Sequence, residues 1–153
     1  MIHTEMSPRE QADRLAIREL VDAYAHCADR RDAQGQKALF TEDTHFVVYM
    51  NGVGTEPTED LHGRGQLTPV FAALNQYAVT MHFNGQSTVT LGGARASGET
   101  YCIAHHVFVA DGVRAIMLAY IRYIDTFVKE DGAWRFGERN LYLEFSDTRA
   151  LAG

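Results

Sequence analysis

The first thirty residues have the spacing of an amphipathic helix. Ser7, Pro8 and Glu10 match a capping box with proline in the first turn, in which serine and glutamate satisfy free N–H groups reciprocally. Apolar side chains then recur every three or four residues, at Ile17, Leu20, Val21, Tyr24 and Ala28. The pattern predicts a helix from about residue 8 to about residue 28, whose apolar stripe must pack on another layer.

The next fifty residues predict short elements of both kinds. Asp32 can cap a short helix through "AQGQKALF", and the β-branched run "TEDTHFVVYM" predicts a strand. We expect a third helix after Gly65, over "QLTPVFAALNQY". The preceding "HGRG", residues 62–65, is typical of a loop that leads into a helix, because it lacks the glycine count and the lysine of a phosphate-binding loop.

From Val79 onward, apolar and polar residues alternate with a period of two. Asp111-Gly112 and Asp131-Gly132 are typical two-residue hairpin turns, and "LGGARASG" predicts a longer connection. Four antiparallel strands follow, at about residues 79–91, 99–110, 113–129 and 133–145. Helices followed by a long meander predict an α+β fold, a single domain over residues 1–153 whose curved sheet wraps around the helices.

Composition limits the class of protein. The 153 residues, 46% of them hydrophobic, can bury one substantial core. The net charge of -6 argues against nucleic acid as a partner. There is neither a signal-peptide pattern nor an apolar run of roughly 20 residues, so we expect a cytoplasmic protein that does not enter a membrane. Cys27 and Cys102 lack CxxC spacing and are expected to be separate buried thiols.

Alternation along the strands indicates which side chains share an interior. In the last predicted strand Arg139, Leu141 and Phe145 fall on one face. In the second strand Cys102 and His106 share a face of small and polar residues that resembles a pocket lining, whereas His105 belongs to the bulkier face. This pattern favours His106 over His105 as the inward histidine.

Five stretches of the sequence together resemble the SnoaL-like branch of the NTF2-like superfamily. They are "AIRELVDAYAHCADRRD", "HGRG", "VTMHFNG", "GETYCIAHH" and "IRYIDTFVKEDGAWRFGER", and their order and spacing span nearly the whole chain. The resemblance implies a cone, in which a strongly bent sheet is closed by helices around a deep apolar cavity. Because such proteins often pair through the sheet, it also implies a homodimer or higher homo-oligomer.

The resemblance also implies a catalytic pair. In dehydratase-like members an Asp near the end of the first helix orients a His on the first long strand, and the matching residues here are Asp29 and His82. Tyr24 matches a tyrosine of bile acid 7α-dehydratase. His105 or His106 would be a further polar group on the next strand, and Arg139 the late arginine. Hexachlorocyclohexane dehydrochlorinase has lysine in place of Tyr24, so halide elimination is not supported.

These residue types suit proton abstraction. Neutral imidazole is a base near physiological pH, and a carboxylate that accepts one ring N–H fixes its tautomer. Tyr24 and the second histidine could protonate a departing hydroxyl, while Arg139 could stabilise negative charge. Arg139, Cys102, Leu141 and Phe145 would contact the substrate. No metal or organic cofactor is required.

Each residue also has a purely structural interpretation. His82 could be a core histidine, Asp29 an exposed charge at a helix end, and Tyr24 a core aromatic. On an ideal helix Asp29 lies about 140° from Tyr24, so one unbroken helix would not direct both into one pocket. Arg139 could simply pair with Glu99 or Glu138.

A metal site is not expected, because His82, His105 and His106 lack HExxH or HxH…E spacing. Three functions from different classes remain. The first is a cofactor-independent lyase that eliminates water from a small apolar, cyclic substrate. The second is an isomerase or cyclase of a polyketide- or terpenoid-like substrate that uses the same dyad. The third is a non-catalytic ligand-binding or dimerisation module.

Overall fold

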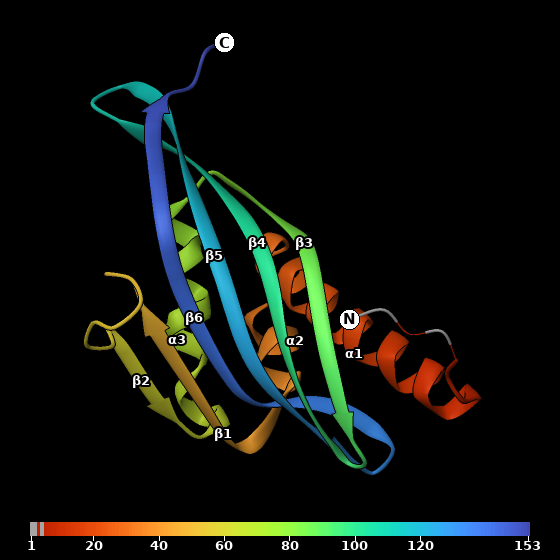
Figure 1. Cartoon of the computed structure of the whole chain (residues 1–153). Coiled ribbons are helices and arrows are strands. Elements are labelled where there is room, and N and C mark those ends of the chain that lie inside the picture. The colour runs from red at the N-terminus through yellow and green to blue at the C-terminus, as the bar shows by residue number, and fades with distance from the viewer. Residues whose placement is uncertain (1–2, 4) are drawn as a thin grey trace.

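Three N-terminal helices and a six-stranded sheet make up the fold of the computed structural model, which describes residues 3 and 5–153 (Figure 1). The elements are α1 (Pro8–Asp29), α2 (Ala33–Ala38), β1 (Phe40–Tyr49), β2 (Glu59–His62), α3 (Thr68–Ala72), β3 (Val79–Gly92), β4 (Arg95–Ala110), β5 (Val113–Glu130) and β6 (Ala133–Ala150). Short 3-10 helices, Arg64–Gln66 and Ala73–Gln76, flank α3. The strand order is β2-β1-β6-β5-β4-β3, and β1 pairs with β6 in parallel whereas every other pairing is antiparallel.

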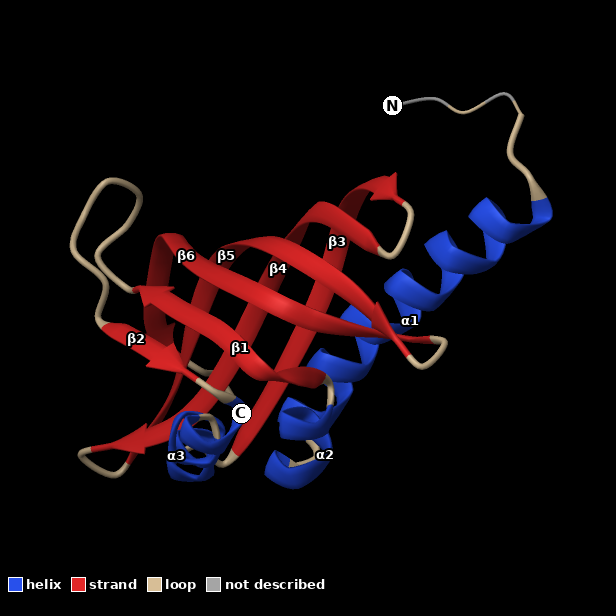
Figure 2. Ribbon diagram, turned by 90° about the horizontal axis from the view of Figure 1, so that it is seen from below, coloured by secondary structure: helices blue, strands red, loops and turns tan. Residues whose placement is uncertain are grey.

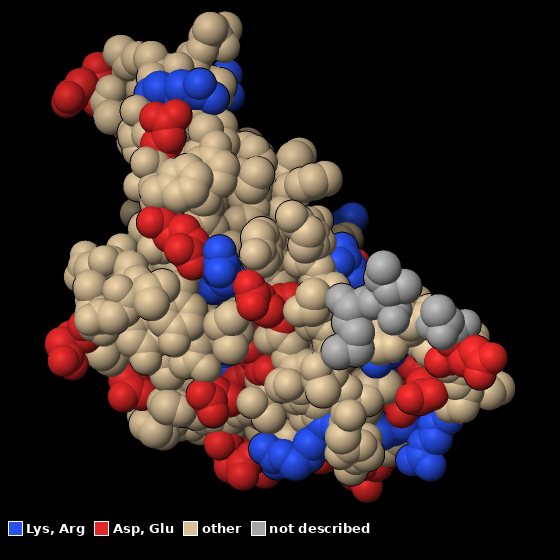
Figure 3. All heavy atoms as spheres, viewed as in Figure 1, with Lys and Arg blue, Asp and Glu red and all other residues tan. Residues whose placement is uncertain are grey.

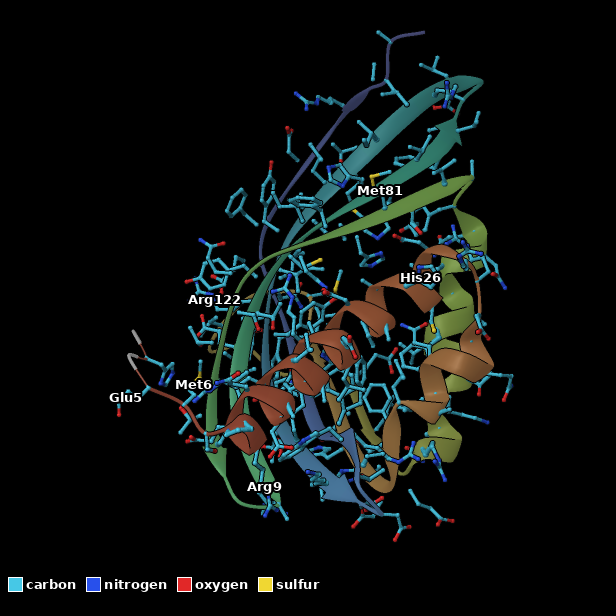
Figure 4. All side chains as sticks on the ribbon, turned by 90° about the vertical axis from the view of Figure 1, so that its right-hand side faces the viewer. Glu5, Met6, Arg9, His26, Met81 and Arg122 are labelled. Carbon is cyan, nitrogen blue, oxygen red and sulfur yellow. The ribbon has the colours of Figure 1, made fainter. Side chains whose placement is uncertain are left out.

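The sheet is strongly curved, and the helices lie on its inner face. Figure 2 shows α1, α2 and α3 on one side of the bent strands, and the side view in Figure 4 shows Arg122 on the side turned away from them. This arrangement is the strongly bent, helix-covered sheet that the resemblance implies. It leaves an inner face that encloses the core and an outer face without helices.

Local signals predicted the first helices and the hairpins correctly. Ser7 accepts a hydrogen bond from the Glu10 N–H and donates its own N–H to the Glu10 carboxylate, so the capping box is present. Asp32 accepts from the Gly35 N–H at 2.8 Å and caps α2. Both Asp-Gly turns have positive φ at both residues, as two-residue hairpins require.

Two expected elements differ from the structure, and one strand was not expected. The third helix is divided into three short pieces, because Pro69 has no N–H to donate and so begins a new first turn. "LGGARASG" is a tight turn at Gly93, whose φ of +72° glycine adopts freely, and the flanking strands continue into it. Strand β2 was not predicted, since its four residues are mostly exposed and have no apolar alternation.

The prediction that Phe145 shares the inner face was wrong. The register of β6 on β5 shifts between Leu143, which pairs with Ile121, and Phe145, which pairs with Tyr120. The extra residue is a β-bulge, which reverses the direction of every following side chain. Phe145 is therefore exposed on the outer face, where its ring stacks on Tyr120 at a centroid distance of 4.2 Å.

Aromatic rings fill the core between the helices and the inner face. Tyr24 of α1 makes edge contacts with the rings of Phe40, Phe71, Tyr123 and Phe136, at centroid distances of 5.7–6.1 Å. These contacts tie α1 to side chains of β1, α3, β5 and β6. Within residues 3 and 5–153, the structure contains no helix that combines the length and the hydropathy needed to cross a membrane.

Candidate active site

A cavity of about 230 Å³ lies between α1, the α3 region and the inner face of the sheet. Its walls are mostly apolar, and its polar lining includes Tyr24, Gln36, Tyr77, His82 and His106. The volume is below the roughly 300–1,000 Å³ typical of pockets for drug-sized ligands, so it fits a small compound. A larger groove of about 450 Å³ lies on the outer face, but it contains no histidine. The acid–base groups therefore place the candidate site in the inner cavity.

Asp29 and His82 are hydrogen-bonded at the wall of this cavity. The Asp29 Oδ1 atom lies 2.7 Å from the His82 Nδ1 atom, and the Asp29 Oδ2 atom accepts the His82 backbone N–H at 2.9 Å. The His82 side chain is only 7% exposed, whereas that of Asp29 is 26% exposed. One carboxylate thus holds both the ring and the backbone of His82.

This geometry resolves the conflict between Tyr24 and Asp29 on one helix. Helix α1 extends unbroken to Asp29, and Tyr24 lines the cavity directly. Asp29 is not among the cavity-lining residues; it reaches β3, and the ring of His82 lines the cavity instead. The two residues therefore need not point in the same direction.

Two further residues fix the carboxylate. Thr80 donates its hydroxyl to Asp29 Oδ1 at 3.0 Å and accepts a hydrogen bond from the Arg31 guanidinium at 2.6 Å. Arg31 has a φ of +60°, which ends α1 and turns the chain back, and its guanidinium also bonds the carbonyls of Ala28 and Tyr77. This network ties the end of α1 to the start of β3, where His82 lies.

The hydrogen bonds determine the protonation of the pair. Burial raises the pKa of Asp29, but hydrogen bonds from His82 and Thr80 outweigh it and hold that pKa below its ordinary value. An ionised carboxylate only accepts, so Nδ1 of His82 carries a proton, and in the neutral ring Nε2 has a free lone pair. Among the residues that the structure describes, none makes a hydrogen bond to Nε2. The ring can therefore act as a base toward a molecule in the cavity.

Tyr24 remains protonated at this site. Burial raises the pKa of its phenol to about 12, and Arg139 and the Gln36 side chain only partly oppose that rise. At neutral pH the Tyr24 hydroxyl is therefore a hydrogen-bond donor.

His106 lines the cavity and His105 does not. The His106 Nδ1 atom lies 3.4 Å from the Met117 carbonyl, which can only accept, so Nδ1 carries the proton and Nε2 is an acceptor. Burial, followed by the nearby His82, lowers the pKa of His106 and keeps it neutral. His105 instead bonds the Met81 carbonyl at 2.9 Å, outside the cavity.

The lowered pKa of His106 predicts a pH-dependent stability. The unfolded chain binds this proton more readily, so the contribution is complete above the ordinary value of about 6.5 and is lost as the pH falls through the folded pKa. We expect the free energy of unfolding, from urea titrations at several pH values, to fall more steeply on acidification in the wild type than in His106→Asn. Equal slopes would contradict this assignment.

Of the four residues predicted to contact the substrate, only one lines the cavity. Leu141 lines the cavity. Cys102 is buried on the inner face but is not part of the cavity wall, and burial raises the pKa of its thiol to about 12, so it is an unreactive core thiol. Arg139 is fully buried and bonds Asp125 rather than Glu99 or Glu138, and Phe145 lies on the outer face. Neither Arg139 nor Phe145 borders the cavity.

Sequence reasoning missed three residues of the site. Thr80 and Arg31 support Asp29, and Gln36, only 2% exposed, lines the cavity beside Tyr24. A signal existed for Thr80, because it precedes His82 by two residues and so shares its face of the strand. Nothing local identifies Arg31 or Gln36.

Comparisons with known proteins agree with this architecture. A family model described as a SnoaL-like domain matches residues 9–140. A protein of Mycobacterium tuberculosis named only as Rv2910c is 26% identical over 136 residues, which cover 88% of this chain and 87% of that protein.

Solved structures share the fold. A provisionally assigned scytalone dehydratase of Novosphingobium aromaticivorans has a TM-score of 0.80 and 22% identity, and the match covers 97% of this chain and 95% of that one. A provisionally assigned aromatic ring hydroxylase from the same organism has a TM-score of 0.74, 26% identity and coverages of 95% and 96%. A hexachlorocyclohexane dehydrochlorinase has a TM-score of 0.71, 18% identity and coverages of 94% and 91%.

Proposed function

The chain belongs to the SnoaL-like domain family of the NTF2-like superfamily, and from that premise we propose that it is a cofactor-independent lyase that eliminates water from a small apolar, cyclic substrate. The observation that carries the proposal is the 2.7 Å contact between Asp29 and His82 at a cavity wall. A shielded base with an orienting carboxylate serves proton abstraction, whereas a passive carrier has no use for one.

The proposed reaction uses the free lone pair of His82. Nε2 takes a proton from a carbon next to a carbonyl, and Asp29 stabilises the imidazolium that forms. The electrons of the broken C–H bond form a carbon–carbon double bond as the neighbouring C–O bond breaks. The departing hydroxide takes the proton from His82 and leaves as water. Tyr24 would donate a hydrogen bond to an oxygen of the substrate, and neutral His106 would accept one.

An isomerase or cyclase is the second candidate, because it begins with the same proton transfer. In an isomerisation the imidazolium would return the proton to another carbon, and no group would leave. The donor at Tyr24 and the acceptor at His106 border the same cavity as the base, which favours a substrate with hydroxyl and carbonyl groups and therefore elimination.

A substrate screen tests the proposal. We would incubate the protein with one-ring and two-ring β-hydroxy carbonyl compounds and follow the conjugated product by ultraviolet absorbance and mass spectrometry. Elimination gives a product lighter by one water, whereas isomerisation gives a product of unchanged mass. Compounds that bind in the cavity, as judged by displacement of a fluorescent apolar dye, but are never turned over would favour the binding module.

We also propose that the outer face of the sheet pairs with a second copy of the chain. Phe83 and Phe145 are 66% and 61% exposed there, and they line the 450 Å³ groove together with Tyr101 and Tyr120. Figure 3 views this face, where uncharged residues cover much of the sheet and charged side chains lie between and around them. Contiguous exposed apolar surface of this kind is typical of interfaces.

If the outer face forms the dimer interface, a charged substitution in it should separate the two copies. Phe83→Glu would place a charge inside the apolar interface, so we expect analytical ultracentrifugation to shift the protein from dimer to monomer. The matched control is Leu15→Glu, because Leu15 is 60% exposed on α1, away from this face. A wild type that sediments as a monomer, or equal effects of both substitutions, would contradict the interface.

A further inference from the structure

A second cluster of titratable side chains lies on the opposite side of the sheet from the cavity. His45 of β1 and His62 of β2 are directly paired across the strands, and Asp60 precedes His62 by two residues, so it lies on the same face of β2. The cluster lies at the edge formed by β1 and β2 (Figure 1). None of its three residues lines the groove of the proposed dimer contact, and strands β6, β5 and β4 separate it from Phe83.

The three side chains converge on one point. The Nε2 atoms of His45 and His62 lie 2.7 Å and 3.2 Å from the same Asp60 oxygen. The two imidazole rings stack at a centroid distance of 4.3 Å and an angle of 13°, which brings both Nε2 atoms to the same carboxylate. The proposed catalysis uses none of these groups.

We propose that His45, Asp60 and His62 form a binding site for a divalent transition-metal ion, with Zn²⁺ as the expected occupant. Their ligand atoms all lie within 4.8 Å of one another. Around a tetrahedral Zn²⁺, bonds of about 2.0–2.1 Å place neighbouring ligand atoms about 3.3 Å apart, so small side-chain rotations suffice. Water or another small ligand would complete the coordination.

Protonation is compatible with this role. A hydrogen bond from His45 is the main cause that lowers the pKa of Asp60, so the carboxylate is ionised. An imidazole that carries its proton on Nδ1 has a free Nε2 lone pair for a metal ion, and the Nε2 atoms of His45 and His62 both lie beside the same Asp60 oxygen. On β6, Glu138 is the register partner of His45 and adds a negative charge to the same face.

The ligand set predicts which ions bind. Imidazole nitrogen with one carboxylate suits Zn²⁺, Cu²⁺ and Ni²⁺, whereas Mg²⁺ and Ca²⁺ prefer oxygen ligands only. The sequence did not reveal this site, because His45 and Asp60 are 15 residues apart and meet only through the pairing of the unpredicted strand β2.

Isothermal titration of the tag-free protein with Zn²⁺ tests the proposal. We expect one saturable site per chain, whose affinity falls at least tenfold in His45→Ala, in His62→Ala and in Asp60→Asn, and which excess Mg²⁺ does not occupy. His26→Ala is the matched control, because it removes an exposed histidine on α1 (Figure 4) and should leave the affinity unchanged.

Folding of the variants is checked by far-ultraviolet circular dichroism. The His62 side chain is 71% exposed, so its removal should not disturb the fold even if His45→Ala does. A wild type without saturable Zn²⁺ binding would overturn the proposal, as would affinity that survives His62→Ala and Asp60→Asn. Neither result depends on the substrate or on the activity of the cavity.

Discussion

Asp29→Asn is expected to lower turnover by about 100- to 10,000-fold, the range seen when a base loses its orienting carboxylate or the base itself is removed. An asparagine can present its amide N–H to Nδ1 of His82, which would move the ring proton to Nε2 and remove the lone pair from the cavity. His82→Ala removes the base itself and should cost at least as much. The measurement is steady-state kinetics on the compound found in the substrate screen.

Matched controls separate a catalytic effect from a structural one. Asp22→Asn removes an exposed carboxylate from the same helix, and His26→Ala removes an exposed histidine there, so both should retain full turnover. If Asp29→Asn folds and retains wild-type turnover, the dyad is structural. If the double variant Asp29→Asn/His82→Ala is no slower than His82→Ala, the two residues act as one unit.

Local patterns predicted the elements whose signals are short-range. Ser7 and Glu10 define the start of α1 because capping is decided within one turn, and each Asp-Gly pair defines a hairpin because a two-residue turn requires positive φ. The register between neighbouring strands, in contrast, is set by long-range contacts. The bulge that turns Phe145 outward depends on how β6 aligns with β5. No sequence pattern near Phe145 indicates that a bulge occurs there.

The candidate site was predictable only in part, for the same reason. The resemblance predicted that Asp29 and His82 form a pair, and in the structure the two side chains are in contact. Arg139 lies on the inner face, as alternation predicts, but alternation cannot show that Asp125 is its register partner on β5 and occupies its guanidinium. A charged residue on an inner face can line a cavity or be buried, and only long-range pairing decides which.

Asp125→Asn is expected to lower the free energy of unfolding by about 3–5 kcal/mol, the usual cost of removing one partner of a buried ion pair. The Arg139 Nε and Nη2 atoms bond the two Asp125 oxygens at 2.9 Å and 3.2 Å, and both side chains are 0% exposed. The guanidinium also lies 3.7 Å from the ring centre of Tyr123 and 4.1 Å from that of Tyr24. Without Asp125, a charge that cannot lose its proton would remain buried without a counterion.

A double-mutant cycle measures this coupling and separates it from a role in substrate binding. Asp125→Asn, Arg139→Met and the double variant Asp125→Asn/Arg139→Met would be compared by urea unfolding, followed by circular dichroism at fixed protein concentration. Because the double variant leaves no charge unpaired, it should lose less stability than the two single variants together. If Arg139→Met instead folds with unchanged stability but a raised KM, the arginine contributes to substrate binding. A loss of stability would assign it to holding β5 and β6 beneath Tyr24, and thus to shaping the floor of the cavity.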